Sequence, residues 1–196
     1  FWRRLSMRSF GLRRTLLNIV ASSLVIISFS GAVQARTECQ FEESNGGFTG
    51  TVLVRGTPQE VFTAIKDSRS SERRKVLSVS GNSVLLEEKF NDLPVIGQAR
   101  CRYREVEVPH QRIDYQIVDS KQFKRFDGKW ELCPVSGGKA TILKLTSCVD
   151  TYLKVPFSKR ITDHGNKKDI RRRLSDIKVR VEGVGPSGRQ ISCATH

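Results

Sequence analysis

Apolar and polar side chains alternate most clearly in residues 126–132 and again in residues 142–149. A repeat of two residues is typical of a β-strand with one buried face. Gly137 and Gly138 lie between the two segments and can adopt the positive φ angles of a tight turn. The predicted hairpin pairs Phe126 with Val149, Trp130 with Leu145, and Leu132 with Leu143. A shift of one residue would bring Lys144 into the apolar row, so the pattern also predicts the register.

The same alternation predicts five further strands separated by turn-forming residues. They cover residues 48–55, 76–80, 83–90, 98–108 and 113–117. In the fourth of these, Arg100, Arg102 and Arg104 alternate with Cys101 and Tyr103, and charge favours the arginines on the face toward water. Between the strands we expect a lead-in at 36–47, a loop or second short helix at 68–74, and a loop at 91–97.

Two helices are predicted from capping residues and from a repeat of three to four residues. Thr57 and Glu60 have the spacing of a capping box, and Pro58 suits a first helical turn. The short helix that follows has an apolar side made of Val61, Phe62, Ala64 and Ile65. A long helix later in the chain has one apolar stripe, made of Ile170, Leu174, Ile177 and Val181.

The order of elements is therefore a strand, a short helix, about six antiparallel strands and a long helix, which is an α+β arrangement. An antiparallel sheet that bends around one long helix leaves a hollow between the two. We expect a domain over residues 48–182 and a flexible tail over 183–196.

The N-terminal segment reads as an export signal. Arg8, Arg13 and Arg14 follow Met7, residues 16–32 are uncharged and rich in apolar side chains, and Ala35 ends a small-x-small cleavage pattern. Residues 1–35 are thus expected to be a signal, with 1–6 as upstream residues. An uncleaved membrane anchor is the alternative. Either reading predicts that the domain is exported, to a periplasm or outside the cell.

The chain is strongly basic, with a formal net charge of +14. Five of its 34 basic residues lie in 1–35, so the remainder has 29 basic and 20 acidic residues. A basic domain favours contact with anionic surfaces such as lipid headgroups or nucleic acid, although a solvated basic surface explains the charge equally well. The exposed side of the long helix contributes Arg171, Arg172 and Lys178 as candidates for contact with an anionic membrane.

Three stretches of the chain resemble a known family. They are Gly50 to Phe62, Gln111 to Tyr115, and Phe126 to Leu132. They are similar to the START-related helix-grip superfamily, in the branch of polyketide cyclases/dehydrases and lipid transport proteins that includes coenzyme Q-binding START domains. The resemblance spans about residues 48–182. It implies a seven-stranded sheet gripping a C-terminal helix around a pocket for a lipid, quinone, sterol or polyketide. Residues 67–74 depart from the family, which often has an aromatic and proline-rich segment there.

In such a fold the inward-facing residues would line the pocket. The candidates are Val52, Val54, Phe62, Tyr103, Tyr115, Phe126, Trp130, Leu143, Leu145, Leu174 and Ile177. A tryptophan on the inner face of a sheet is as often core as pocket wall, so Trp130 by itself does not distinguish the two.

The sequence offers little for catalysis or metal binding. It has no GxSxG or HExxH motif, no CxxC spacing, and three scattered histidines, so we expect neither a metal nor a cofactor. Glu105 and Glu107 share a face near the end of a strand and are expected to be solvated, and His110 is expected to be a surface residue in a turn.

Two functions remain open on this reading. The first is a monomeric exported carrier of a hydrophobic small molecule, and the second is a cyclase or dehydratase acting on a polyketide-like substrate in the same pocket. Nucleic-acid binding is disfavoured, because the basic residues 167–180 have no interleaved aromatic side chains.

The five cysteines allow two disulfides in an oxidising compartment. The hairpin register staggers Cys133 and Cys148 by six residues, about 20 Å at roughly 3.3 Å per residue, whereas a disulfide needs Cα atoms within about 7 Å. If the first strand runs beside residues 141–150, as the helix-grip fold implies, Cys39 can reach Cys148. The predicted pairs are then Cys39–Cys148 and Cys133–Cys193, with Cys101 as an inward-facing free thiol.

Overall fold

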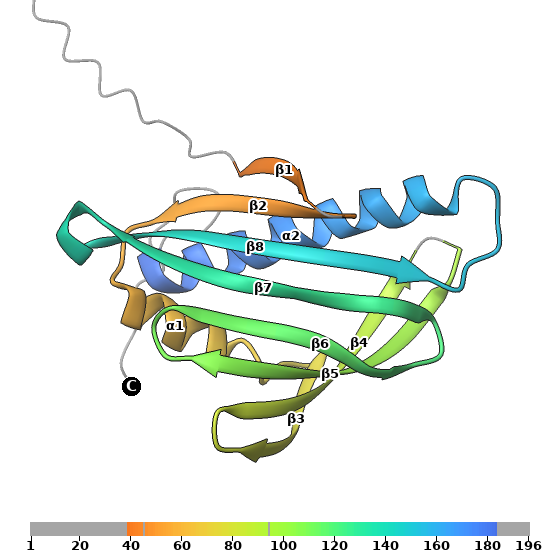
Figure 1. Ribbon diagram of the computed structural model, residues 1–196, viewed down its shortest axis with the longest axis horizontal. Helices are drawn as coiled ribbons and strands as arrows, with labels where there is room; N and C mark the ends of the chain where they lie inside the picture. The colour runs from red at the N-terminus through yellow and green to blue at the C-terminus, as the bar shows by residue number, and fades with distance from the viewer. Residues whose placement is uncertain (1–38, 45, 94, 184–196) are drawn as a thin grey trace, which may run out of the picture. The chain divides into compact units, whose positions relative to one another are not determined.

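The computed structural model describes residues 39–44, 46–93 and 95–183. These residues form one antiparallel sheet and two helices (Figure 1). The strands are β1 (Gln40–Ser44), β2 (Gly47–Val54), β3 (Arg74–Ser80), β4 (Ser83–Leu93), β5 (Gly97–Val108), β6 (Arg112–Ser120), β7 (Phe123–Val135) and β8 (Ala140–Thr151). The helices are α1 (Pro58–Asp67) and α2 (Ser158–Glu182), and a short 3-10 turn covers Ser136–Gly138. The sheet order is β1-β2-β8-β7-β6-β5-β4-β3, which confirms the predicted α+β helix-grip arrangement.

The central hairpin has the predicted register. Phe126 lies opposite Val149, Trp130 opposite Leu145, and Leu132 opposite Leu143. The turn between β7 and β8 has φ angles of 66° at Gly137 and 83° at Gly138. Residues with a side chain rarely adopt such angles. The two glycines therefore allow the chain to turn at this point, which keeps the apolar residues of β7 and β8 on the same face.

The start of α1 also follows the sequence. The Glu60 amide donates to Thr57 Oγ1 at 3.3 Å, and the Thr57 amide donates to Glu60 Oε2 at 2.7 Å, which completes the capping box. The helix buries the four predicted apolar residues, Val61, Phe62, Ala64 and Ile65.

Two expectations about the connecting segments are wrong. The lead-in 36–47 contains β1, which pairs with β2 and adds an eighth strand at the edge of the sheet. The predicted loop 91–97 begins too early, because β4 continues to Leu93. In both places a polar sequence is held in the sheet by backbone hydrogen bonds, which do not depend on apolar side chains. Between α1 and β3 the chain forms a turn, which resolves the choice left open for residues 68–74.

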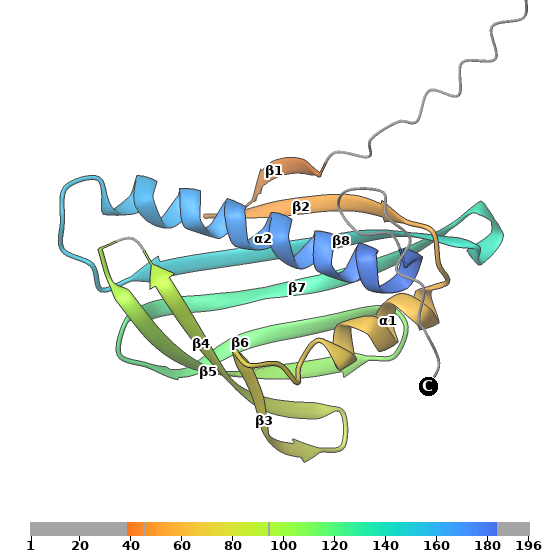
Figure 2. The same cartoon turned by 180° about the vertical axis from the view of Figure 1, so that it is seen from behind.

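Helix α2 lies along β2 and β8 on the inner face of the sheet (Figure 2). It buries Ile170, Leu174 and Ile177, as its apolar stripe predicted. The helix approaches β2 closely at Gly50, where a Cβ atom would lie 2.5 Å from Ile170 Cγ2. Any larger residue at position 50 would therefore push α2 away from the sheet.

The predicted signal (1–35) and nearly all of the predicted tail (183–196) lie outside the described residues, so both stay predictions. Neither helix in the described part of the chain combines the length and apolar character needed to cross a bilayer.

Candidate ligand-binding site

The predicted pocket residues all come together between the sheet and the helices. Each of the eleven is buried, and all belong to one apolar cluster on the inner face. They come from β2 (Val52, Val54), α1 (Phe62), β5 (Tyr103), β6 (Tyr115), β7 (Phe126, Trp130), β8 (Leu143, Leu145) and α2 (Leu174, Ile177). A role in lining a ligand pocket stays a prediction for these residues.

Phe126 is the centre of an aromatic cluster within this interior. Its ring centroid lies 5.3 Å from that of Tyr103, 5.4 Å from Tyr115, 5.6 Å from Phe90 and 5.8 Å from Phe123. The rings meet edge-on or tilted, as their quadrupoles favour. Four strands, β4 to β7, thus contribute to one continuous aromatic surface.

Tyr115 occupies the space left by a missing side chain. Gly128 faces inward on β7, and a Cβ atom there would lie 2.7 Å from the Tyr115 hydroxyl. The hydroxyl reaches past Gly128 and donates to the Thr146 carbonyl oxygen on β8 at 3.2 Å. Burial raises the pKa of Tyr115, so the hydroxyl stays protonated and remains a donor.

An ionic network crosses the interior beside the aromatic cluster. Arg173 of α2 donates from Nη2 to both carboxylate oxygens of Glu88 on β4, at 2.9 and 3.0 Å. The Tyr103 hydroxyl donates to Glu88 Oε2 at 3.1 Å, and Arg74 Nε lies 3.1 Å from Glu88 Oε1. The Arg173 guanidinium carbon lies 5.9 Å from the centre of the Phe126 ring. Charged and aromatic groups therefore share one buried region.

A second network lies between the end of α1 and β5. Arg69 Nε donates to Glu105 Oε2 at 2.7 Å, and Arg69 Nη1 donates to Glu107 Oε1 at 2.5 Å. The remaining nitrogen, Nη2, lies 2.6 Å from Glu105 Oε2 but is not aligned for a hydrogen bond. Arg69 is thus held by the carboxylates of both Glu105 and Glu107.

Burial and charge set the protonation of these groups. Burial acts to lower the pKa of Arg173, but the carboxylates of Asp169 and Glu88 outweigh it and raise the pKa well above its ordinary value. Burial, followed by the nearby charge of Glu88, raises the pKa of Tyr103 well above its ordinary value. Burial also raises the pKa of Glu105, although Arg69 acts against this.

The expectation that Glu105 and Glu107 are solvated is wrong. Glu105 is 5% exposed and faces inward, because it shares its side of β5 with Cys101 and Tyr103. The arginines of that strand point outward, as predicted. Because side chains alternate along a strand, Glu105, which directly follows Arg104, points inward. His110 is exposed, as predicted, with its ring edge-on to Phe62 at 5.5 Å.

The sequence reasoning also missed Glu88, Arg69 and Arg173. On β4, Val84, Leu86 and Glu88 are buried at every second position. The alternation of the strand could therefore have predicted that Glu88 faces inward. Arg173 is a buried polar position beside Leu174, within the apolar stripe of α2. Arg69 belongs to the segment 67–74 that departs from the family pattern, and nothing in that segment signals an inward arginine.

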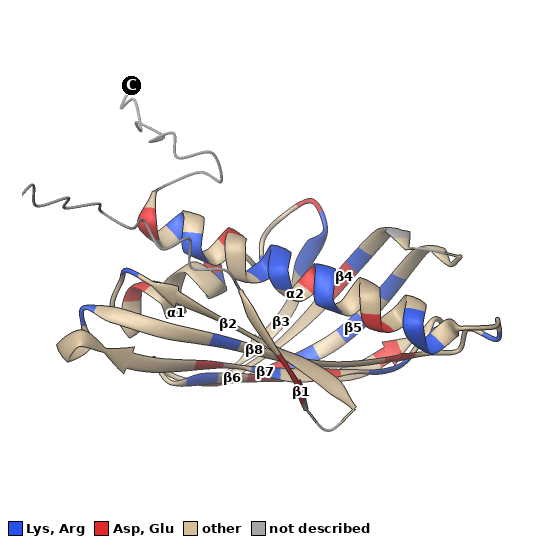
Figure 3. Ribbon diagram, turned by 90° about the horizontal axis from the view of Figure 1, so that it is seen from above, with Lys and Arg blue, Asp and Glu red and all other residues tan. Residues whose placement is uncertain are grey.

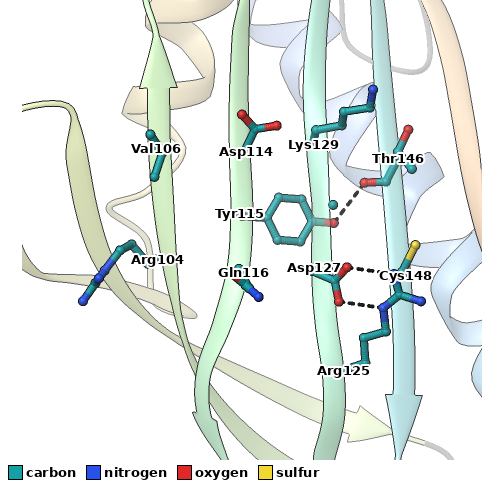
Figure 4. Close-up of a pocket in the computed structure, with 11 residues that line it drawn as sticks. Arg104, Val106, Asp114, Tyr115, Gln116, Arg125, Asp127, Lys129, Thr146 and Cys148 are labelled. Atoms are coloured by element: carbon teal, nitrogen blue, oxygen red, sulfur yellow. Dashed lines mark hydrogen bonds and ion pairs between the residues drawn. The ribbon is translucent and has the colours of Figure 1, made fainter.

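Two hollows open on the other, outer side of the sheet. The smaller, of about 500 Å³, lies across β5 to β8 (Figure 4). Arg125 Nε and Nη2 donate to the two oxygens of Asp127 within it, at 2.8 and 3.0 Å. The larger, of about 810 Å³, is lined mostly by charged and amide side chains of β4, β5 and the β6–β7 turn. Their polar linings suit water better than an apolar ligand.

Acidic residues lie among the more numerous basic residues of α2 (Figure 3). Arg172 pairs with Asp169 at 2.5 Å and with Asp176 at 3.5 Å. Lys178 pairs with Glu182 at 2.5 Å, and Arg171 lies 5.1 Å from the ring of Phe41. Arg172 and Lys178 therefore have ion-pair partners within the domain, and membrane contact through this face stays a prediction.

The Cys39–Cys148 disulfide was predicted wrongly. Both thiols are free and lie on opposite faces of β2. Cys39 Sγ is 3.2 Å from where a Cβ of Gly50 would lie, on the side of α2, whereas Cys148 Sγ adjoins Gly47 and the outer hollow. Cys133 is also free and exposed, and its predicted partner Cys193 lies outside the described residues.

Two further cysteine predictions are confirmed, the free thiol of Cys101 and the separation of Cys133 from Cys148. Cys101 is a buried free thiol, as expected. Cys133 lies opposite Ile142 and Cys148 opposite Asp127, which is the stagger that excludes a Cys133–Cys148 bridge.

Among the residues that the structure describes, no three His, Cys, Asp or Glu side chains gather as a metal site, and the expectation of no metal stays a prediction.

Solved structures with this fold include an aromatase/cyclase, a START superfamily protein and a STAR-related lipid transfer protein. The Zhui aromatase/cyclase from Streptomyces sp. R1128 is 12% identical, with a TM-score of 0.58 over 77% of this chain and 99% of that one. A START superfamily protein from Mycobacterium smegmatis is 15% identical, with a TM-score of 0.52, and the match covers 68% of this chain and 95% of that protein. A STAR-related lipid transfer protein from Xanthomonas axonopodis is 11% identical, with a TM-score of 0.53 over 74% and 97%. A search of curated proteins found no significant match.

Residues 46–182 match the family described as polyketide cyclase / dehydrase and lipid transport. The match covers the chain from the start of β2 to the end of α2, the same elements that enclose the aromatic cluster and the ionic network. The chain therefore belongs to the polyketide cyclase / dehydrase and lipid transport family.

Proposed function

We propose that the chain carries a hydrophobic small molecule that has at least one polar acceptor group. The ligand would lie between α2 and the inner face of β4 to β7. Its apolar part would contact the aromatic cluster around Phe126, and its acceptor would reach the arginines of the ionic networks. A lipid, a quinone-like ring or a polyketide-like ring meets this description.

The observation that carries the proposal is the buried Arg173–Glu88 pair beside Phe126, at 8% and 2% side-chain exposure. Removing two charges from water is so unfavourable that apolar residues of similar size often stabilise a fold as well or better. Stability alone is therefore a weak reason for a charged pair at the centre of this interior. Recognition of a ligand's polar group is a better one.

Arg69 supports the same chemistry. Its Nη2 is the one buried side-chain nitrogen or oxygen without a hydrogen bond in the part of the chain described. Nη2 keeps its ion pair with Glu105 at 2.6 Å, and a ligand acceptor aligned with its N–H would add a hydrogen bond to a charged group, which contributes about 1.5–3 kcal/mol. Carbonyl, phenolate and carboxylate oxygens all qualify.

We further propose that the carrier is exported and acts as a monomer. The arginines after Met7 and the apolar run of residues 16–32 support export. A carrier that acts outside the cytoplasm needs no nucleotide or redox cofactor, in keeping with the absence of their motifs from the sequence.

A cyclase or dehydratase is the second candidate, and one contact favours it. The Tyr103 hydroxyl donates to Glu88 at 3.1 Å, and burial keeps it protonated. If this hydroxyl turned from Glu88 to a substrate, the protonated phenol would donate to the substrate carbonyl and polarise it. The two candidates differ in what leaves the protein, because a carrier releases the molecule that it bound and an enzyme releases a changed one.

The test is organic extraction of purified protein followed by mass spectrometry. We expect one hydrophobic compound, bound in near-stoichiometric amount and recovered unchanged after incubation. A Tyr103→Phe variant keeps the ring, so it should still bind the compound, whereas an enzyme using the hydroxyl would lose turnover. If neither wild-type protein nor refolded protein retains or takes up any hydrophobic compound, the proposal is wrong.

A further inference from the structure

Apolar side chains are exposed at the end of the domain where β8 leads into α2. The connection between them exposes 56% of Tyr152 and 71% of Phe157. The turn between β4 and β5 lies at the same end (Figures 1 and 2) and exposes 64% of Val95. Exposed apolar groups that gather in one place mark interaction surfaces more often than isolated ones do.

The backbone holds two of these side chains outward in an unfavourable conformation. Phe157 has a φ angle of 61° and Val95 one of 69°, both in the left-handed region. Bulky and β-branched residues rarely adopt it, and where they do the strain often accompanies function. Hydrogen bonds from the Ser158 amide to Val155 and from the Ile161 amide to Phe157, both 3.1 Å, fix the turn at the start of α2.

One cation lies beside each of the two exposed rings. The Arg160 guanidinium carbon lies 5.7 Å from the Phe157 ring centre, and Lys124 Nζ lies 5.6 Å from that of Tyr152. Lys154 and Arg160 have no ion pair within the described residues. The N-terminus of α2 adds a partial positive charge at the same place.

The geometry points to an anionic lipid bilayer as the partner of this surface, which comprises Val95, Tyr152, Lys154, Phe157 and Arg160. Aromatic rings favour the boundary between headgroups and acyl chains, and lysines and arginines beside them are attracted to anionic headgroups. A ring held outward with a cation next to it meets both requirements at once. The inference goes beyond the proposed function, because it holds whatever ligand the interior takes. It also assigns the contact to a surface other than the paired residues of the α2 face.

Hydrogen–deuterium exchange of the full chain tests the assignment, because the readout is local to each segment. Residues 16–32 are apolar and can attach the chain to a vesicle by themselves, so total binding is not informative. With vesicles of 70% phosphatidylcholine and 30% phosphatidylserine, we expect slower exchange at residues 152–160. Pure phosphatidylcholine should protect them much less, and 0.5 M salt should remove most of the difference.

Two double variants separate the rings from the charges. Tyr152→Ser with Phe157→Gly removes the rings, and glycine suits the left-handed backbone, so the fold is retained. It should raise the vesicle concentration for half-maximal protection by about tenfold or more. Lys154→Gln with Arg160→Gln should raise it by roughly 25-fold. The matched control is Lys75→Gln with Val79→Ser, which changes an exposed cation and an exposed apolar residue on β3 and should have no effect.

Protection at 152–160 that depends on phosphatidylserine and weakens in both variants supports the assignment. Three results overturn it. The segment is not protected, or protection appears at residues 167–180 instead, or it appears without vesicles as protein concentration rises. The last result would identify a protein partner, namely a second copy of the chain.

Discussion

Arg173 Nη2 donates to both carboxylate oxygens of Glu88, and so links the middle of α2 to a strand 85 residues earlier in the chain. Helix α2 rests mainly on β2 and β8, at the other side of the sheet. The pair is therefore a direct bond between the helix and the strands that curve away from it. We expect it to fix the distance between α2 and β4.

The first prediction concerns this pair. Arg173→Met and Glu88→Leu should each lower the free energy of unfolding by about 1.5–3 kcal/mol, because each removes charged hydrogen bonds while the remaining group keeps one counter-ion, Arg74 for Glu88 and Asp169 for Arg173. The double variant should lose less than the sum of the two, with a coupling of about 1–3 kcal/mol. Urea unfolding measures all four proteins. Additive losses would show that the two side chains do not act together.

The second prediction concerns Gly128, beneath the Tyr115 ring. Gly128→Ala should lower the free energy of unfolding by roughly 1–3 kcal/mol, since the new methyl group would lie 2.0 Å from the Thr146 carbonyl oxygen and 2.7 Å from the Tyr115 hydroxyl. Thermal and urea unfolding measure the loss.

The control for Gly128 is a glycine with free space around it. Gly165 lies inside α2 with no atom within 4 Å of where a Cβ would be placed. Gly165→Ala should therefore raise stability by about 0.5–1 kcal/mol. If both substitutions shift stability in the same direction, the close approach of Tyr115 to Gly128 is not what limits that position.

The third prediction is a dependence of stability on pH. Burial acts to raise the pKa of Asp169, but Arg173 and Arg172 outweigh it and hold the pKa below its ordinary value of 3.8. As the pH falls below that value, the unfolded chain takes up the proton first. The stabilising contribution of Asp169 is thus present above about pH 4 and is lost as the pH falls through the folded-state pKa.

Asp169→Asn should accordingly remove part of the loss of stability in acid, as measured by urea unfolding from pH 6 to pH 2. The stability contribution of Glu105 should change with pH in the opposite direction, because burial raises its pKa above 4.5 in the folded state. Its contribution is present below pH 4.5 and is lost as the pH rises, so Glu105→Gln should gain stability relative to wild type as the pH rises from 4 to 7. Equal slopes in both variants would contradict these assignments.

The fourth prediction orders the thiols by reactivity. In fully reduced protein, exposed Cys133 should react with a thiol reagent first. Cys39 and Cys148 should follow, because burial raises the pKa of both thiols. Cys101 should react only after unfolding, since burial and then the charge of Glu88 raise its pKa to about 12. Peptide mapping of labelled protein gives the order.

The same mapping without reduction tests connectivity in protein from an oxidising compartment. We expect no Cys39–Cys148 peptide, because the two sulfurs lie on opposite faces of β2. A Cys39–Cys148 peptide would show that β1 and β2 rearrange, and a Cys133–Cys193 peptide would support the bridge still predicted there.

The fifth prediction compares two buried aromatic residues. For each variant we compare the loss of affinity for a hydrophobic fluorescent probe with the loss of stability. This ratio should be larger for Phe126→Leu than for Trp130→Ala, because Phe126 contacts four other rings and Arg173. Trp130→Ala should lower stability by about 3–5 kcal/mol if its site is dry core, and by less if it borders a cavity. Probe titration and urea unfolding of both variants give the comparison. Equal binding in Phe126→Leu and wild type would exclude the aromatic cluster as a ligand surface.

The sequence by itself determined the elements whose patterns are local. The register of β7 and β8 followed from Lys144 and the glycine turn, the start of α1 from Thr57 and Glu60, and the buried stripe of α2 from its repeat of three to four residues. In each case neighbouring residues carry all the information, because strand alternation and helix capping act over a few positions.

The tertiary structure decided which polar side chains face inward and what they meet. Strand parity could have placed Glu88 and Glu105 inside, but nothing local pairs Glu88 with Arg173, or turns Arg69 out of a polar segment into the core. Cys39 and Cys148 similarly needed the position of β1, which comes from a polar sequence paired by backbone hydrogen bonds. Such contacts join residues far apart in the chain, and their energy depends on burial that only the folded sheet and helix create.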